Sequence, residues 1–227
     1  MLDTKYRCQT LLPMFRHEAI ETLKGLKFYL ETLEWFIDRE RTQEISELKK
    51  HIEQWSPEQQ EDFWAWHYPV HWDEIFASQL RSSFVPTLIS LTESHIGMIA
   101  DQACEILTTS IKPRDLRGGL FEQHRKYLEA MAGFTRPSDA TWNSLYEIRD
   151  VRNCVVHANS RIYDSRNQER LRSLVRKLPG LSASYDVLEL SPEFLLHGLK
   201  VIEGFITDLY EEASALCQRV SKERNDS

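Results

Sequence analysis

The chain has 227 residues, of which 41 % are hydrophobic and 28 % charged, so it can bury a sizeable core as an ordinary soluble domain does. It contains only 8 Gly and 8 Pro, which favours long helices over a fold of short strands and turns. No stretch approaches the roughly 18 consecutive apolar residues that span a membrane, and the start lacks the apolar core of a signal peptide. We therefore expect a cytoplasmic protein without a membrane partner.

The cysteines are Cys8, Cys104, Cys154 and Cys217, and no two of them form a C-x-x-C pair. This spacing indicates neither a zinc site nor a disulfide framework. We therefore expect four buried thiols in a reducing compartment. The chain also lacks the usual sets of metal ligands, so we expect no metal and no other cofactor.

The net charge of −7 argues against a general nucleic-acid binder, but the basic residues are unevenly distributed. Residues 111–177 carry 14 Lys and Arg against 8 Asp and Glu, whereas the remainder carries 14 against 27. Because salt screens charges beyond roughly 8–10 Å, a locally basic segment can attract RNA phosphates on an acidic protein. Solvated faces of ordinary helices are the alternative interpretation of the same charges.

Residues 1–71 predict an N-terminal helical extension, either separate or packed as part of the main domain. Apolar residues recur at helical spacing over residues 12–54, which predicts one long helix or a helix broken once. Ser56 and Pro57 then supply a cap and a first helical position. Aromatic residues cluster within residues 58–74, and we interpret them as core or dimer interface rather than as a base-stacking surface.

A second long helical pattern spans residues 72–108, and Pro86 should kink or split it. Glu93 lies in the apolar middle of this pattern. Because a buried carboxylate needs a partner, Glu93 either pairs with Arg152 or Arg149 or simply faces solvent.

The rest of the chain predicts shorter elements and a final long helix. We expect helices over about 119–133, 139–161, 164–177 and 191–221, and a short strand or hairpin arm over 184–190. Residues 72–221 thus predict the main domain, an all-α bundle of long antiparallel helices with at most a short β-strand or hairpin. Residues 222–227 predict a frayed tail.

The helix predicted over residues 139–161 carries the unusual chemistry of the chain. Ser138 is placed to cap it, and neither Gly nor Pro interrupts it. At helical spacing, one polar stripe is formed by Tyr146, Asp150, Asn153 and His157. A second, apolar stripe that we expect to be buried is formed by Ile148, Val151 and Val155.

Within this helix, Arg152-Asn153-Cys154-Val155-Val156-His157 resembles the Arg–polar–three residues–His signature of the HEPN superfamily, the all-helical domains of many prokaryotic RNases and toxins. The resemblance is sharpest over residues 146–161, is looser over 72–221 and does not clearly cover 1–71. It implies a HEPN-like helical bundle that acts as a metal-independent endoribonuclease, usually as a homodimer that brings two motifs together. It also implies a toxin or phage-defence effector, with an antitoxin protein as a possible partner.

One position departs from a pattern seen in part of that superfamily. Some HEPN toxins carry a Tyr two residues after the His, which a partner nucleotidyltransferase modifies. Here that position is Asn159. Neutralisation by modification there is unsupported, so any antitoxin is expected to act in another way.

The residues of the motif suit cleavage of RNA by its own 2′-hydroxyl group. Histidine is the side chain best fitted to transfer protons at physiological pH, which suits His157 to catalysis. Arg152 stays charged and can grip phosphate oxygens, and Asn153, one turn before His157, can orient the imidazole. Arg149 and Arg161 are candidates to bind flanking phosphates. The expected products carry a 2′,3′-cyclic phosphate and a 5′-hydroxyl.

Arg152 and His157 are five residues apart, which puts them on different sides of an ideal helix. We therefore expect that they do not lie side by side on one helix. A site that combines them needs His157 at a helix end, or two copies of the helix packed across a two-fold axis. We favour the two-fold arrangement, as the resemblance implies, with Asp150 and Glu93 in supporting positions.

Two other interpretations stay open. In the first, the HEPN-like bundle binds nucleotide, RNA or a partner protein without cleaving anything. In the second, the Asp, Arg and His side chains merely decorate an exposed helix of an unrelated scaffold. RNA that stays intact with the wild-type protein would favour the first of these.

Overall fold

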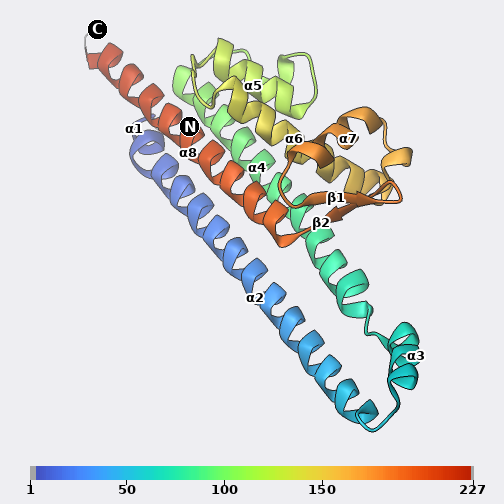
Figure 1. Cartoon of the computed structure of the whole chain (residues 1–227). Coiled ribbons are helices and arrows are strands. Elements are labelled where there is room, and N and C mark those ends of the chain that lie inside the picture. The colour runs from blue at the N-terminus through green and yellow to red at the C-terminus, as the bar shows by residue number, and fades with distance from the viewer. Residues whose placement is uncertain (1–3, 226–227) are drawn as a thin grey trace.

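The structure is a computed structural model in which residues 4–225 are described (Figure 1). These residues are mostly helical (80 %) and include a short two-stranded antiparallel hairpin near the C-terminus, so the predicted all-α bundle is confirmed. The long helices are α2 (Leu12–Ile52), α4 (Ser78–Leu107), α6 (Asp139–Ala158) and α8 (Pro192–Asn225). The shorter helices and the strands are α1 (Thr4–Tyr6), α3 (Pro57–His67), α5 (Leu120–Ala130), α7 (Gln168–Lys177), β1 (Leu181–Ser184) and β2 (Val187–Leu190). Two π-helical turns, η1 (Arg7–Leu11) and η2 (Trp72–Ala77), and two 3-10 turns, η3 (Pro113–Asp115) and η4 (Ile162–Asp164), connect them.

The core of the bundle lies between α4 and α8, and α6 packs against both of them. The facing side chains are almost fully buried, among them Ile89, Ile96 and Ile99 of α4 and Ile202, Phe205 and Leu209 of α8. From α6, the buried ring of Trp142 meets Phe205 edge-on, with 4.7 Å between the ring centroids. Because burial of each such side chain contributes roughly 1.5–3 kcal/mol, this core fixes the position of α6.

The N-terminal half of α2 runs antiparallel to α8 and shares the same core (Figure 1). Its buried residues Leu12, Ala19, Leu23 and Leu30 follow helical spacing and belong to the cluster that α4, α6 and α8 form. This half of the predicted extension therefore packs as part of the main bundle.

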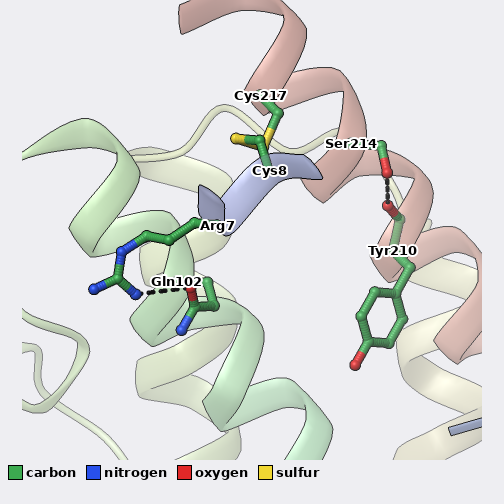
Figure 2. The surroundings of a disulfide bond; sticks show 6 residues. All are labelled: Arg7, Cys8, Gln102, Tyr210, Ser214 and Cys217. Carbon is green, nitrogen blue, oxygen red and sulfur yellow. Dashed lines mark hydrogen bonds between the residues drawn. A yellow bond between two sulfur atoms is a disulfide. The ribbon is translucent and has the colours of Figure 1, made fainter. Parts of the chain in front are cut away.

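A disulfide joins Cys8 of η1 to Cys217 of α8, with an S–S distance of 2.05 Å and Cα atoms 5.7 Å apart (Figure 2). The expectation of four free thiols is therefore wrong for this pair. The two cysteines are 209 residues apart in sequence, and only the antiparallel packing of α2 on α8 brings them together. Cys104 and Cys154 are free and buried, as expected. Arg7, beside Cys8, donates hydrogen bonds to the α4 side chains of Gln102 and Glu105.

Beyond Leu30, the distal half of α2, α3 and η2 form an arm that extends away from the bundle (Figure 1). A small second cluster of Ile37, Ala77 and Leu80 supports the base of this arm. No residue of α3 is buried, so the interpretation of the aromatic cluster as core is wrong for this helix. Trp72 of η2, in contrast, is half-buried and packs against the second cluster. The dimer-interface interpretation stays a prediction.

Several predicted boundaries shift for local reasons. Pro86 lies inside α4 without splitting it, and the hairpin of β1 and β2 begins three residues earlier than the predicted arm. The predicted basic helix over 164–177 starts only at Gln168, after the 3-10 turn η4. Residues 222–225 continue α8 instead of fraying, whereas residues 1–3 and 226–227 lie outside the described part. Within residues 4–225, each helix is too short or too polar to cross a bilayer.

Candidate functional site

Helix α6 presents the motif because its opposite face is anchored in the core. The Ser138 hydroxyl accepts a hydrogen bond from the Thr141 amide at 3.3 Å, and it caps the helix as predicted. Ile148 and Val151 are buried as predicted, whereas Val155 is only half-buried and Cys154 takes its place in the core. Burial also raises the pKa of the Cys154 thiol to about 11, which keeps it protonated and unsuited to act as a nucleophile.

Arg152 and His157 meet on this single helix. The Arg152 Nη1 atom lies 3.5 Å from His157 Nε2, at the outer limit of a hydrogen bond. The expectation that these side chains do not lie side by side is therefore wrong. α6 ends at Ala158, directly after His157, and the backbone turns into the left-handed region at Asn159. The long arginine side chain reaches an imidazole at the helix end, which is the first of the two arrangements considered above.

Asn153 lies beside the pair but contacts the arginine. Its Oδ1 accepts a hydrogen bond from Arg152 Nη1 at 3.0 Å, and in the described part of the chain its side chain makes no hydrogen bond with His157. The predicted orienting role toward the imidazole is therefore not seen. Asn153 instead holds the guanidinium where it can reach His157.

A pocket of about 540 Å³ opens beside this helix end. Its walls come from α6, from the end of η4 and from the loop after it, and they are formed by Asp150, Asn153, His157, Ala158, Asp164, Ser165, Arg166 and Asn167. Three of the four residues of the predicted polar stripe thus line one pocket. His157 is exposed, while Asn153 and Arg152 are half-buried. The guanidinium is accordingly held in place while the imidazole faces the pocket.

A second pocket of about 550 Å³ adjoins the first, because both are lined by Asp150 and Asn167. The basic residues of its wall are Arg125, Lys126, Arg149 and Arg170, and the acidic ones are Glu122, Glu129 and Asp150. Asp150 forms an ion pair with Arg170 of α7 and is itself largely buried, so this pair fastens α7 to the motif helix between the two pockets. The two hollows therefore lie side by side, one on each side of this ion pair.

The two predicted phosphate-binding arginines both have protein partners. Arg149 pairs with Glu122 at 3.3 Å, and its guanidinium lies over the rings of Tyr146 and Phe121 at 4.7 and 5.0 Å from the centroids. Arg161 is about half exposed and pairs with Asp164 at 3.2 Å. Arg149 therefore borders the second pocket, and Arg161 lies past the end of α6.

The predicted partner of Glu93 is not found. Arg149 binds Glu122, and Arg152 binds Asn153 and His157, so neither arginine is paired with Glu93. In the described part of the chain the half-buried Glu93 has no ion pair or side-chain hydrogen bond, and its supporting role is unsupported. Conversely, sequence reasoning missed Arg170 and Lys126, whose only signal was the excess of basic residues over 111–177.

Within residues 4–225, no group of three or more His, Cys, Asp or Glu side chains is placed to hold a metal ion. Comparisons with known protein families, curated proteins and solved structures found no match.

Proposed function

We propose that the protein is a metal-independent endoribonuclease that cleaves RNA through the 2′-hydroxyl group. The observation that carries this proposal is the contact between Arg152 and His157, 3.5 Å apart at an exposed helix end beside two adjoining pockets. A fixed cation and a proton-transfer group at this distance can act on the same phosphodiester.

The contact also suggests how substrate would engage the pair. A guanidinium only donates hydrogen bonds, so Arg152 is the donor and His157 Nε2 the acceptor of this contact. When a phosphodiester enters, its oxygens compete for the Arg152 donors, and Nε2 becomes free to accept a proton. One group thus holds the phosphate while the other acts as base.

The reaction then follows from the chemistry of RNA. His157 takes the proton of the 2′-hydroxyl, the 2′-oxygen attacks phosphorus, and the bond from phosphorus to the 5′-oxygen breaks. Water supplies the proton for the leaving oxygen, and the hydroxide so formed takes the proton that His157 holds, which restores the neutral base. Arg152 balances the charge that builds on the phosphate oxygens. The products carry a 2′,3′-cyclic phosphate and a 5′-hydroxyl.

The resemblance of the motif to the HEPN superfamily extends this proposal. It implies a toxin or phage-defence role, a homodimer and an antitoxin partner. In this proposal each chain holds both groups of its own site, because Arg152 and His157 meet within one protomer. A second copy is therefore not needed to complete the pair. Dimerisation would instead place two such sites on one assembly.

The deciding experiment incubates RNA with purified protein in excess chelator and analyses the ends of the products. We expect cleavage with cyclic-phosphate ends, and a loss of at least about 100-fold for His157→Ala and Arg152→Ala. His157→Ala should keep the wild-type melting temperature within a few degrees, because the imidazole is exposed. Arg152→Ala should lower it only modestly, because the half-buried guanidinium bonds to Asn153 and His157 of the same helix. Matched controls are Arg16→Ala and His17→Ala, two exposed residues of α2 that should leave cleavage unchanged.

The second candidate is an RNA-binding protein that does not cleave. The second pocket favours it, since its four basic side chains outnumber its three acidic ones and phosphate binding there does not depend on His157. In that case RNA would bind in a salt-dependent manner and stay intact, and Arg170→Ala would weaken binding while His157→Ala would not.

A further inference from the structure

Four of the five non-glycine residues with positive φ in residues 4–225 lie in two turns that face each other. Asn159 and Ser160 form the turn after the motif helix, with φ of 49° and 63°. Tyr185 and Asp186 form the turn of the hairpin, with φ of 49° and 62°. Left-handed backbone is costly for most residues other than glycine, although Asn and Asp tolerate it, so the cost here falls mainly on Ser160 and Tyr185.

The two turns are joined by backbone hydrogen bonds. The Leu188 amide donates to the Ser160 carbonyl and the Ile162 amide donates to the Asp186 carbonyl, both at 2.8 Å. The Asp186 carboxylate in turn accepts a hydrogen bond from Arg172 of α7 at 2.7 Å. The tip of the hairpin is therefore held against the chain only a few residues after His157.

Tyr185 is an unexpected residue for this turn. The pairing of Ser184 with Val187 leaves a two-residue loop in which both residues have positive φ, a type I′ turn that favours Asn or Gly at its first position. The tyrosine side chain is 97 % exposed, so it contributes almost no packing that would offset the backbone cost. If position 185 served only to form the turn, Asn would adopt this backbone conformation at a lower free-energy cost than Tyr.

The side chains of Arg161 and Tyr163 are also exposed near this turn, and side chains of these types bind unpaired bases. Arg161 is bridged to Val187, and the Ile162 amide donates to the Asp186 carbonyl, so Arg161 and Tyr163 belong to the segment that pairs with the hairpin turn. Tyr163 is 50 % exposed, and a hydrogen bond with it raises the pKa of Arg161. Aromatic rings and guanidinium planes on a fixed backbone are the usual stacking partners for RNA bases.

We propose that Tyr185, supported by Tyr163, stacks on an unpaired base of single-stranded RNA next to the phosphate held at Arg152 and His157. This inference rests on the proposed ribonuclease function, and it assigns the substrate class as single-stranded rather than duplex RNA. In a duplex the bases are already stacked on one another and do not offer a free face.

The test uses Tyr185→Asn, which removes the ring and suits the turn better. We expect KM for a single-stranded oligonucleotide to rise about fivefold or more, with kcat nearly unchanged, because a stacking contact contributes to binding throughout the reaction. The melting temperature should stay the same or rise, since Asn tolerates positive φ. Tyr185→Trp should keep the wild-type KM, and Tyr29→Ala, which removes a half-exposed tyrosine of α2, serves as the matched control.

An abasic substrate separates stacking from other effects of the substitution. When the oligonucleotide lacks the base next to the scissile phosphate, wild type and Tyr185→Asn should have the same KM. An unchanged KM for Tyr185→Asn on the intact strand would overturn the inference and leave the ribonuclease proposal standing. A lower melting temperature would also overturn it, because it would reveal a packing role.

The binding step can be followed independently of cleavage. In the His157→Ala background, anisotropy of labelled RNA should show weaker binding when Tyr185→Asn is added, and tighter binding of single strands than of duplex. If wild-type protein cleaves no RNA, the proposed function fails. If duplex RNA binds as tightly as single strands, the stacking inference fails.

Discussion

The bundle and the arm carry similar sequence patterns but opposite environments. In the bundle, Trp142 is 1 % exposed and lies against Phe205 of a neighbouring helix. In the arm, Trp66 is 85 % exposed, although it also lies on a helix rich in aromatic residues. The difference arises from α8, which runs beside the first half of α2 but does not reach its second half. An apolar stripe therefore indicates a helix, while burial depends on a second helix being present.

The sharpest test of this contrast replaces one tryptophan in each region. Trp142→Ala should lower the free energy of unfolding by about 3–5 kcal/mol, because it leaves a cavity in the core. Trp66→Ala should change it by less than about 0.5 kcal/mol. Urea denaturation followed by circular dichroism measures both, and equal losses would mean that the arm packs as tightly as the bundle.

The next effect concerns the disulfide, which joins two segments of the bundle. Reduction, or Cys8→Ser, should lower the free energy of unfolding by about 2–4 kcal/mol, since the bond closes a long loop of the unfolded chain. The control is the Cys8→Ser, Cys217→Ser double variant, whose stability should not respond to reductant. A wild-type protein equally stable with and without reductant would contradict the expectation.

A smaller effect should follow from pH through two histidines of the bundle. Burial lowers the pKa of His95 and of His124 below 6.5, despite the opposing influence of Glu18 and Asp101 respectively. The unfolded chain therefore binds these protons more readily, and stability falls as the pH drops below about 6.5, by at most about 1.4 kcal/mol per pH unit for each histidine.

The measurement is the free energy of unfolding between pH 7.5 and pH 5. His95 Nδ1 lies 2.8 Å from the hydroxyl of Tyr210, so its neutral ring is a partner in the core. His95→Gln should therefore be less stable at pH 7.5 but should depend less on pH. Replacement of the exposed His51, at the far end of α2, provides the control, and a similar loss of pH dependence there would contradict the assignment.

Periodicity predicted the parts of the molecule that depend on neighbours within a helix. The long helices, the cap at Ser138 and the shared face of Asp150, Asn153 and His157 all follow from helical spacing, and these three residues line one pocket. The short hairpin followed from alternation between turn residues. These features depend on contacts within a few residues along the chain, which local patterns report well.

The features that were not predicted depend on distant or flexible contacts. The disulfide required two segments 209 residues apart to pack together, and the pairing of Arg149 with Glu122 instead of Glu93 depended on which helices adjoin α6. The meeting of Arg152 and His157 depended on where α6 stops and on the reach of a long side chain. An ideal helix gives the angle between two Cα atoms but not the path of a guanidinium.

The bond between Cys8 and Cys217 has a consequence for a chain cut at the tip of the arm. A protease that cleaves the turn between α2 and α3 would divide the backbone into two fragments that stay covalently attached through the sulfur atoms. Such a nicked molecule would migrate as a single species until a thiol is added. Only then would the fragment that contains α2 be free to diffuse away from the rest.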